Sequence, residues 1–223
     1  MKYIFTEEQF ITLLVLAGQK SLYMFSREED LDDSAIVHAV AQLYRRKQAM
    51  QSGGRIVLTG EVMELVRVMG LSEYIIKLTL REGVPGQQLI YPGAGGQGPV
   101  IVLEKQSGPG RPQVKLWPAE PEAYVRDLFD NEQLPRSLTE HREEAMALEG
   151  HAQKDLEAGH EEMFFEAERI RAEDGERDNR IRGFRSLVFP WLDVLCRDVS
   201  YCHMYSAEEA AGLLLKEIRG EEL

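Results

Sequence analysis

The sequence predicts an α+β fold in which an antiparallel sheet is flanked by helices. Apolar residues recur at helical spacing in the first 70 residues and alternate with period two between Tyr74 and Trp117. The first and last predicted helices each open with a capping-box sequence, at residues 6–9 and 206–209. With 43% hydrophobic residues, the 223-residue chain can bury a sizeable core without disulfide bonds or metal ions.

Residues 1–72 are predicted to form a winged-helix-like segment with the order helix, helix, small hairpin, helix. The first helix should occupy residues 6–18, because a capping box opens it and a glycine ends it. A second helix, with acidic residues at its start and basic residues at its end, should span residues 34–47. A turn and short strand at 51–59 then lead into a helix capped by Thr59.

Residues 73–131 are predicted to form a β-meander that ends in a helix. The connections between its strands are rich in Gly and Pro, which break regular structure. The helix should run from about Glu120 to Asp130, because Pro121 suits a first helical turn. The predicted strands contain the apolar runs 76–80, 89–91, 100–103 and 114–116.

Residues 132–178 are predicted to be an acidic helical connector. Residues 137–175 are dominated by Glu, Ala, Arg and Leu, which favour helix. Residues 119–179 carry 19 acidic and seven basic side chains, a difference of 12 that equals the whole net charge of −12. The main apolar patch of the connector includes Phe164 and Phe165. We therefore interpret most of this helix as a solvated surface.

Residues 179–223 are predicted to form a second sheet-plus-helix half-module. Its last helix should follow the capping box that begins at Ser206. The pattern strand, aromatic residue, Ala-Glu, helix occurs at 115–123 and again at 203–211. This echo predicts a quasi-two-fold repeat of two half-modules within one compact fold. The predicted strands of the second half are residues 182–188, 191–197 and 199–205.

No pattern in the sequence indicates an enzyme, a metal site or a cofactor. The glycine-rich run at residues 93–98 is followed by Pro99 and a β pattern, whereas a phosphate-binding loop leads into a helix. His141, His151 and His160 are ten and nine residues apart, which does not place them on one helix face. No nucleophile motif is present. We expect no catalytic residues, no cofactor and no metal.

Charge and hydropathy exclude two further classes of function. The longest apolar run, Leu13–Ala17, is too short to span a bilayer, and acids interrupt the start of the chain, so we expect a cytoplasmic protein without membrane insertion. Residues 1–70 hold eight basic and nine acidic side chains, so no nucleic-acid partner is expected. The alternative is a winged-helix transcription regulator whose β-rich part senses a ligand or dimerises. Its DNA-reading side chains would be His38, Gln42, Arg45, Arg46, Lys47 and Arg55.

Several segments together follow the pattern of a known family. They are the opening Phe5–Leu14, the strand Gly54–Leu58, the helix Glu61–Met69, the strands Tyr74–Arg81, Val100–Lys105 and Gln113–Trp117, the helix Glu120–Phe129 and the closing Trp191–Ile218. This organisation resembles the EspG-type cytosolic chaperones of type VII (ESX) secretion systems and their Firmicute relatives. The resemblance implies a quasi-two-fold fold with a central antiparallel sheet and helical bundles. It also implies a non-enzymatic chaperone or adaptor that keeps a helical secretion substrate soluble.

A chaperone of this kind needs apolar anchors within a polar rim on its surface. The three Gly- and Pro-rich connections at residues 82–87, 92–99 and 107–112 are the first prediction for the contact surface. The acidic helix around Phe164 and Phe165 is the second. A homodimer is also compatible with the sequence. The predicted partner-binding residues are Gly95, Gly96, Gln97, Gly98, Phe164 and Phe165, and further candidate anchors are Trp117, Tyr124 and Trp191.

Overall fold

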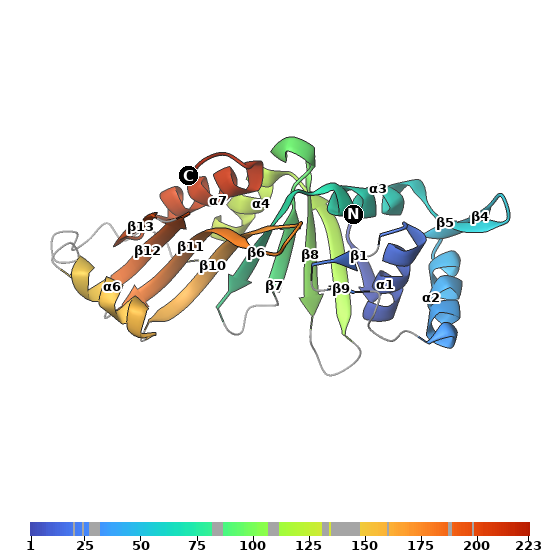
Figure 1. The fold of residues 1–223 in the computed structure, drawn as a ribbon, viewed down its shortest axis with the longest axis horizontal. Helices are drawn as coiled ribbons and strands as arrows, with labels where there is room; N and C mark the ends of the chain where they lie inside the picture. The colour runs from blue at the N-terminus through green and yellow to red at the C-terminus, as the bar shows by residue number, and fades with distance from the viewer. Residues whose placement is uncertain are drawn as a thin grey trace.

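The computed structural model contains a nine-stranded antiparallel sheet with helices on both faces (Figure 1). It describes residues 1–19, 21–23, 25–26, 32–81, 87–106, 112–130, 134, 148–159, 161–186, 189–197 and 199–223. The sheet strands are β1 (Tyr3–Thr6), β6 (Tyr74–Leu80), β7 (Gln87–Tyr91), β8 (Val100–Gln106), β9 (Gln113–Ala119), β10 (Glu162–Arg171), β11 (Arg177–Ser186), β12 (Phe189–Cys196) and β13 (Val199–Met204). Their spatial order is β1-β9-β8-β7-β6-β10-β11-β12-β13. The predicted α+β fold class is confirmed.

The helices of the described residues are short, and two small hairpins lie outside the main sheet. The helices are α1 (Glu7–Leu16), α2 (Asp33–Arg45), α3 (Gly60–Leu71), α4 (Pro121–Asp130), α6 (Glu149–Ala158) and α7 (Ala207–Arg219), with a 3-10 turn η1 (Ala94–Gly96). The hairpins are β2 (Ser21–Leu22) with β3 (Phe25–Ser26), and β4 (Ala49–Ser52) with β5 (Arg55–Leu58). Within the described part of the chain, no helix is both long and apolar enough to cross a membrane.

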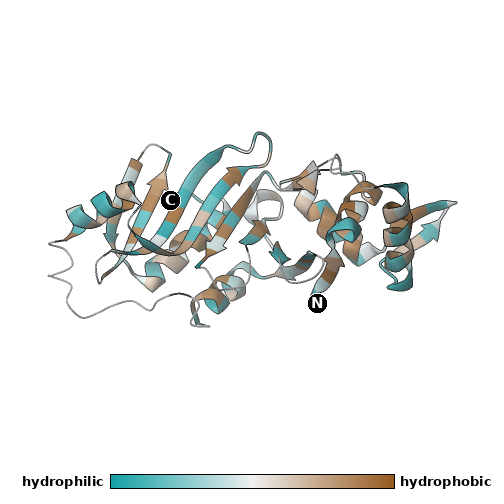
Figure 2. Ribbon diagram, turned by 90° about the horizontal axis from the view of Figure 1, so that it is seen from below, coloured by the Kyte–Doolittle hydropathy of each residue, from teal (hydrophilic) through white to brown (hydrophobic). Residues whose placement is uncertain are grey.

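Three apolar clusters hold the layers together, because side chains alternate between the two faces of each strand. On one face, α4 and α7 cover the central strands of the sheet, from Val100 of β8 to Val194 of β12. On the other face, α1 and α3 cover β7, β8 and β9, while α6 covers the strands near Trp191. Brown apolar and teal polar positions alternate along the strands (Figure 2). The sheet is therefore the middle layer of three.

Local capping explains the ends of two predicted helices. Thr6 Oγ1 accepts a hydrogen bond from the Gln9 amide at 3.3 Å, and Gln9 Oε1 accepts one from the Thr6 amide at 3.0 Å. This reciprocal pair confirms the predicted capping box of α1. Ser206 Oγ accepts from the Glu209 amide at the start of α7. Thr59 stands at the N-cap of α3, but its side chain donates to the Gln48 carbonyl and does not cap the helix.

The prediction of one continuous acidic helix is wrong from residue 162 onward: residues 162–171 form strand β10, residues 172–174 form a turn, and β11 begins at Arg177. Strand β10 pairs antiparallel with β6 and β11 and lies in the middle of the sheet. Helix propensity is a weak local preference, and the burial of Phe165 and Ala167 on alternate positions overrides it here. The predicted helix is confirmed over α6. The part at residues 135–147 lies outside the described residues.

The same order of elements occurs twice along the chain. Strands β6 to β9 form a meander followed by α4, and strands β10 to β13 form a meander followed by α7. The two meanders join where β6 and β10 run antiparallel, with Leu78 opposite Ala167. The quasi-two-fold repeat of the half-modules and a winged-helix-like fold for residues 1–72 stay predictions.

Candidate functional site

The helices α4 and α7 lie side by side and run in opposite directions. Glu122, in the first turn of α4, forms an ion pair with Arg219, the last residue of α7. At the other end of the pair, Phe129 and Asp130 of α4 lie near Ala207 at the start of α7. Both helices rest on the same face of the sheet through one apolar cluster.

A mostly apolar groove of about 610 Å³ runs along the seam between these two helices. On α7, the groove is lined by Ala207, Ala211 and Leu215, which are four residues apart and share one side of the helix. Val125 and Phe129 of α4 line the opposite side, and Phe129 packs edge-on against the buried Phe165 ring at 6.4 Å. We call this hollow the α4–α7 groove. Its complete lining is Glu122, Val125, Arg126, Phe129, Asp130, Ala207, Glu208, Ala211, Gly212 and Leu215.

Charged side chains surround the apolar part of the α4–α7 groove. The rim residues Glu122, Arg126, Asp130 and Glu208 are exposed, so the rim has three acidic groups and one basic group. Gly212 is exposed on the same helix, and a Cβ built there has no atom within 4 Å. The bottom of the groove is formed by closely packed core side chains. At the surface beside Gly212 there is open space for an added side chain.

The predicted contact loop at residues 95–98 lies next to the end of this helix pair. Gly95, Gly96, Gln97 and Gly98 line a second hollow together with Glu120, Pro121, Glu122, Arg219 and Glu221. Gly96 is buried, has φ +70°, and lies so close to the Arg219 carbonyl that a Cβ would overlap it. The connection therefore packs on α7, which the sequence did not predict.

The three predicted loops do not form one surface. The connection at 92–99 leaves β7 at Tyr91 and enters β8 at Val100. The strand ends that flank the other two connections lie at the opposite end of the meander, where Gln87 pairs with Lys105. The prediction of a common contact surface is thus wrong, since successive connections of a meander alternate between its ends. Residues 82–86 and 107–111 lie outside the described residues.

Phe164 and Phe165 lie in the core and not on an exposed helix. Their exposed fractions are 5% and 0%, and Phe164 also packs edge-on against Tyr205 at 5.2 Å. Of the other proposed anchors, Tyr124 and Trp191 are buried as well. Trp117 is partly exposed, with Lys2 Nζ lying 4.4 Å from its ring centre. These aromatic residues stabilise the sheet and its helices.

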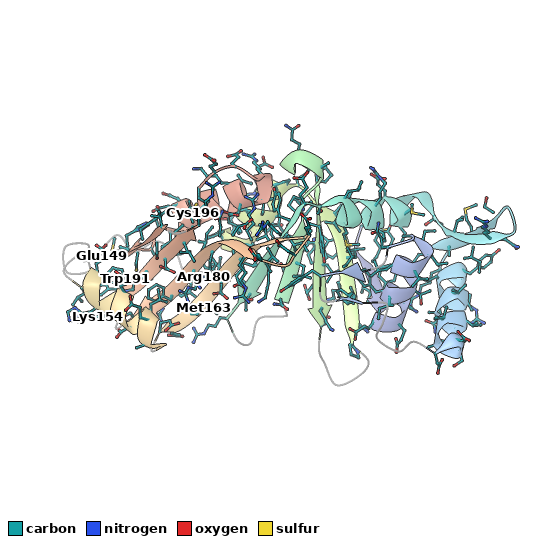
Figure 3. All side chains as sticks on the ribbon, in the orientation of Figure 1. Glu149, Lys154, Met163, Arg180, Trp191 and Cys196 are labelled. Carbon is teal, nitrogen blue, oxygen red and sulfur yellow. The ribbon has the colours of Figure 1, made fainter. Side chains whose placement is uncertain are left out.

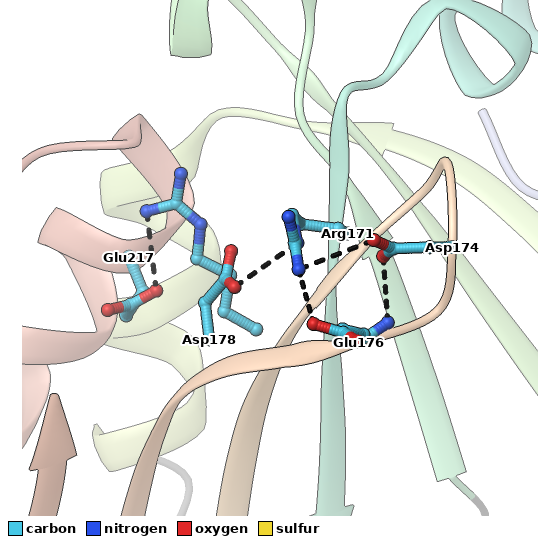
Figure 4. Close-up of polar contacts among 6 residues, drawn as sticks. Arg171, Asp174, Glu176, Asp178 and Glu217 are labelled. Atoms are coloured by element: carbon cyan, nitrogen blue, oxygen red, sulfur yellow. Dashed lines mark hydrogen bonds and ion pairs between the residues drawn. The ribbon is translucent and has the colours of Figure 1, made fainter. Parts of the chain in front are cut away.

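A polar cluster lies where the β10–β11 hairpin approaches the end of α7 (Figure 4). Arg171 forms ion pairs with Asp174, Glu176 and Asp178 at 3.3, 2.5 and 3.3 Å. Three carboxylates of the same hairpin thus surround the single charge of Arg171. The cluster therefore explains how the hairpin is held, and it leaves little positive charge for a ligand.

Next to the polar cluster around Arg171, the buried carboxylate of Glu217 accepts a hydrogen bond from Asn179 Nδ2 at 2.6 Å. Arg169 Nη1 lies 3.8 Å from Glu217, and its guanidinium stacks on the Tyr74 ring at 4.1 Å. Burial raises the pKa of Glu217 above its usual value, while Asn179 and Arg169 oppose that change. The net direction is upward because a carboxylate loses its hydration in the core.

The face of the sheet that is turned away from α4 and α7 carries a series of ion pairs between adjacent strands. Buried Glu168 pairs with Lys77 at 3.0 Å and with Arg177 at 2.9 Å. Buried Asp193 pairs with Arg182 at 3.2 Å. Arg180 and Trp191 lie on neighbouring strands in this half of the sheet (Figure 3). Because paired charges on adjacent strands stabilise their register, a structural role accounts for these ion pairs.

Of the side chains proposed for DNA reading, His38, Gln42 and Arg45 lie along one side of α2, because they have the spacing i, i+4, i+7. His38 contacts Gln42, and Arg46 donates to the Ile4 carbonyl at 2.9 Å. Arg45 and Lys47 are exposed. Among the described residues, no group of His, Cys, Asp and Glu is arranged to hold a metal ion.

Comparison with known proteins gives no relative from which a site could be transferred. No protein-family model matches the chain, and no curated protein matches its sequence. The choice of site therefore depends on geometry. The α4–α7 groove is the candidate functional site, because it combines partly exposed apolar side chains, open space and a charged rim. Sequence reasoning missed it, although the spacing of Ala207, Ala211 and Leu215 was a signal for a second apolar side of α7.

Proposed function

We propose that this protein binds an amphipathic helix of a partner protein in the α4–α7 groove. The proposal depends on one observation, an apolar groove between two antiparallel helices that is bordered by charged side chains. Helix-in-groove recognition uses apolar side chains at i, i+3, i+4 and i+7 on the bound helix. Such a helix would lie between α4 and α7 and extend the helical layer on this face of the sheet.

The charges of the rim indicate which helix would fit. Asp130 and Glu208 lie at the same end of the groove, and Arg126 is the one basic rim residue. A partner helix with Lys or Arg beside its apolar stripe would place positive charge near these carboxylates. Charge complementarity of this kind increases association rate and specificity more than affinity. We therefore expect a moderately basic amphipathic helix.

This activity agrees with the chaperone or adaptor role that the resemblance to EspG-type proteins implies. A chaperone that covers an apolar helix keeps its client soluble until the helix reaches its final partner. The type VII secretion client is part of this proposal, which assigns the client's contact surface to the α4–α7 groove in place of the predicted loops. Binding would require no bond making or breaking by the protein.

Filling the groove without disturbing the core is the direct test of the proposal. We predict that Gly212→Trp weakens partner binding at least about tenfold, which corresponds to about 1.4 kcal/mol. The fold should be retained, because a Cβ at Gly212 meets no atom within 4 Å. The matched control is Gly150→Trp in α6, where an added Cβ also meets nothing within 4 Å.

The experiment begins with capture of binding proteins from lysate of the source cells on immobilised wild-type, Gly212→Trp and Gly150→Trp protein. A partner retained by the wild type and by Gly150→Trp is then purified, and its affinity for each is measured by calorimetry. The partner's binding segment should be an amphipathic helix. If Gly212→Trp binds that partner as tightly as Gly150→Trp does, the groove is not the binding site.

A further inference from the structure

The helix α2 presents an apolar stripe to solvent at one end of the elongated molecule (Figure 1). Val37 and Tyr44 are 68% and 53% exposed, and Ala41 between them is also exposed. Together with half-buried Val40, these residues have the spacing i, i+3, i+4, i+7, which places them on one side of a helix. The inward side of the same helix uses Ala39 and Leu43.

The neighbouring hairpin carries further exposed apolar side chains on both of its faces, because Met50 is paired with Val57 and Ile56 with Gln51. Met50 of β4 and Ile56 of β5 are 50% and 41% exposed, and β4 packs beside α2. Four of the nine exposed large apolar side chains of the described residues thus lie on α2 and its adjacent hairpin. A concentration of exposed apolar side chains on a folded surface marks an interaction site, whereas single exposed apolar residues do not.

The charges on this part of the molecule differ from those of the whole chain. Residues 32–58 contain the acidic residues Asp32 and Asp33 and four basic residues, Arg45, Arg46, Lys47 and Arg55, which gives a net charge of +2. The whole chain has a net charge of −12. Two copies of the chain therefore repel each other over most of their surfaces but much less when they approach through α2.

The charges along α2 are also complementary to those of a second α2 that runs in the opposite direction. The acidic residues lie at the N-terminal end of the helix and the basic residues at its C-terminal end. A two-fold axis between Val40 and Ala41 would place Val37 opposite Tyr44 of the second copy. The same axis would place Asp33 opposite Gln48 and therefore one position from Lys47 of the second copy, and the antiparallel arrangement would also align the helix dipoles favourably.

We propose that α2 is the interface of a homodimer, in which two copies pair antiparallel through Val37, Val40, Ala41 and Tyr44. The interface is isologous, since each surface meets its own copy. One short helix and a hairpin provide a small contact area, so the dimer should dissociate in the micromolar range. The α4–α7 groove lies on a different part of the molecule and remains open in this arrangement.

Sedimentation velocity over about 1–200 μM protein, a range that brackets micromolar dissociation, is the first test. We expect the wild-type mass to rise from 25.4 kDa toward twice that value. The Val37→Lys/Tyr44→Lys variant should remain monomeric over the whole range. The matched control is Val199→Lys/Tyr201→Lys on the edge strand β13, where the same residue types are 66% and 42% exposed.

A charge exchange tests the antiparallel arrangement. Asp33→Lys and Lys47→Asp should each weaken self-association, because like charges then lie near each other across the two-fold axis. An equimolar mixture of the two variants should recover it, because each mixed pair again brings a lysine near an aspartate. Circular dichroism melting curves serve to show that every variant is folded.

Three results would overturn the proposal. The wild type could remain monomeric at all concentrations, or the dimer could persist in Val37→Lys/Tyr44→Lys. The third is a dimer abolished by the β13 variant alone, which would place the interface at the sheet edge. None of these results bears on partner binding in the α4–α7 groove.

Discussion

Glu217 is a buried carboxyl group whose pKa the fold raises. Its carboxylate lies in the core beside Asn179, and burial raises its pKa above the usual 4.5. Folding therefore favours the protonated form. The stability that protonation adds is fully present below about pH 4.5 and is lost as the pH rises through the folded pKa.

Replacing this carboxylate with an amide removes the titration and keeps the acceptor for Asn179. We predict that the free energy of unfolding of Glu217→Gln decreases less than that of the wild type between pH 4.5 and 7.5. Urea denaturation at both pH values measures the difference. The exposed neighbour Glu222 provides a control, since Glu222→Gln should behave like the wild type. Equal pH dependence of the wild type and Glu217→Gln would contradict the assignment.

Two glycines illustrate how the same substitution has opposite effects in different elements. Gly183 lies in β11, where a Cβ would overlap the rings of Phe164 and Phe165. Gly212 lies on the solvent-exposed side of α7, where a Cβ would have no atom within 4 Å. Overpacking a core is destabilising, whereas removing glycine from a helix interior stabilises the helix.

We predict that Gly183→Ala lowers the free energy of unfolding by about 1–3 kcal/mol. Gly212→Ala should raise it by about 0.5–1 kcal/mol. Chemical denaturation of the two variants beside the wild type is the measurement. A Gly183→Ala protein as stable as the wild type would show that Phe164 and Phe165 can move aside, and that β10 and β11 are packed less closely than described.

Sequence patterns predicted those elements whose causes are local. The capping box at Thr6 and the N-cap bond of Ser206 lie within four residues of the amides that they bind, so α1 and α7 were placed correctly, although Glu209 contacts His203 and does not complete the predicted second box. Strand β10 was not, because its Glu, Ala and Arg residues favour helix locally. The partners that make it a strand, Lys77 and Arg177 among them, lie outside β10, and Lys77 is 91 positions away from Glu168.

The candidate site was beyond sequence reasoning for a similar reason. The α4–α7 groove requires that two helices separated by more than 70 residues lie side by side, and no local pattern specifies that contact. The glycine-rich connection at 92–99 was identified correctly as a link between strands. Its position against Arg219 depends on the same long-range packing. Aromatic residues were poor guides because most of them fill the core.

At the scale of the whole molecule, the two meanders share one core. The cluster beneath α4 and α7 joins Ile76 and Val102 of the first meander to Leu192 and Val194 of the second. Strands β6 and β10 pair along seven residues of each strand. Neither meander can therefore unfold without exposing apolar surface of the other. We expect a single cooperative transition for the entire sheet.

The chain contains two tryptophans, and each reports on one meander, Trp117 in β9 and Trp191 in β12. We predict that in Trp117→Phe and in Trp191→Phe, the fluorescence of the remaining tryptophan and the far-UV circular dichroism change at the same denaturant concentration. The comparison is made within each variant, because loss of the buried Trp191 will lower stability more than loss of the partly exposed Trp117. If one tryptophan instead follows an early step and the other a late step of a two-stage change in circular dichroism, the meanders unfold separately and the β6–β10 junction is not cooperative.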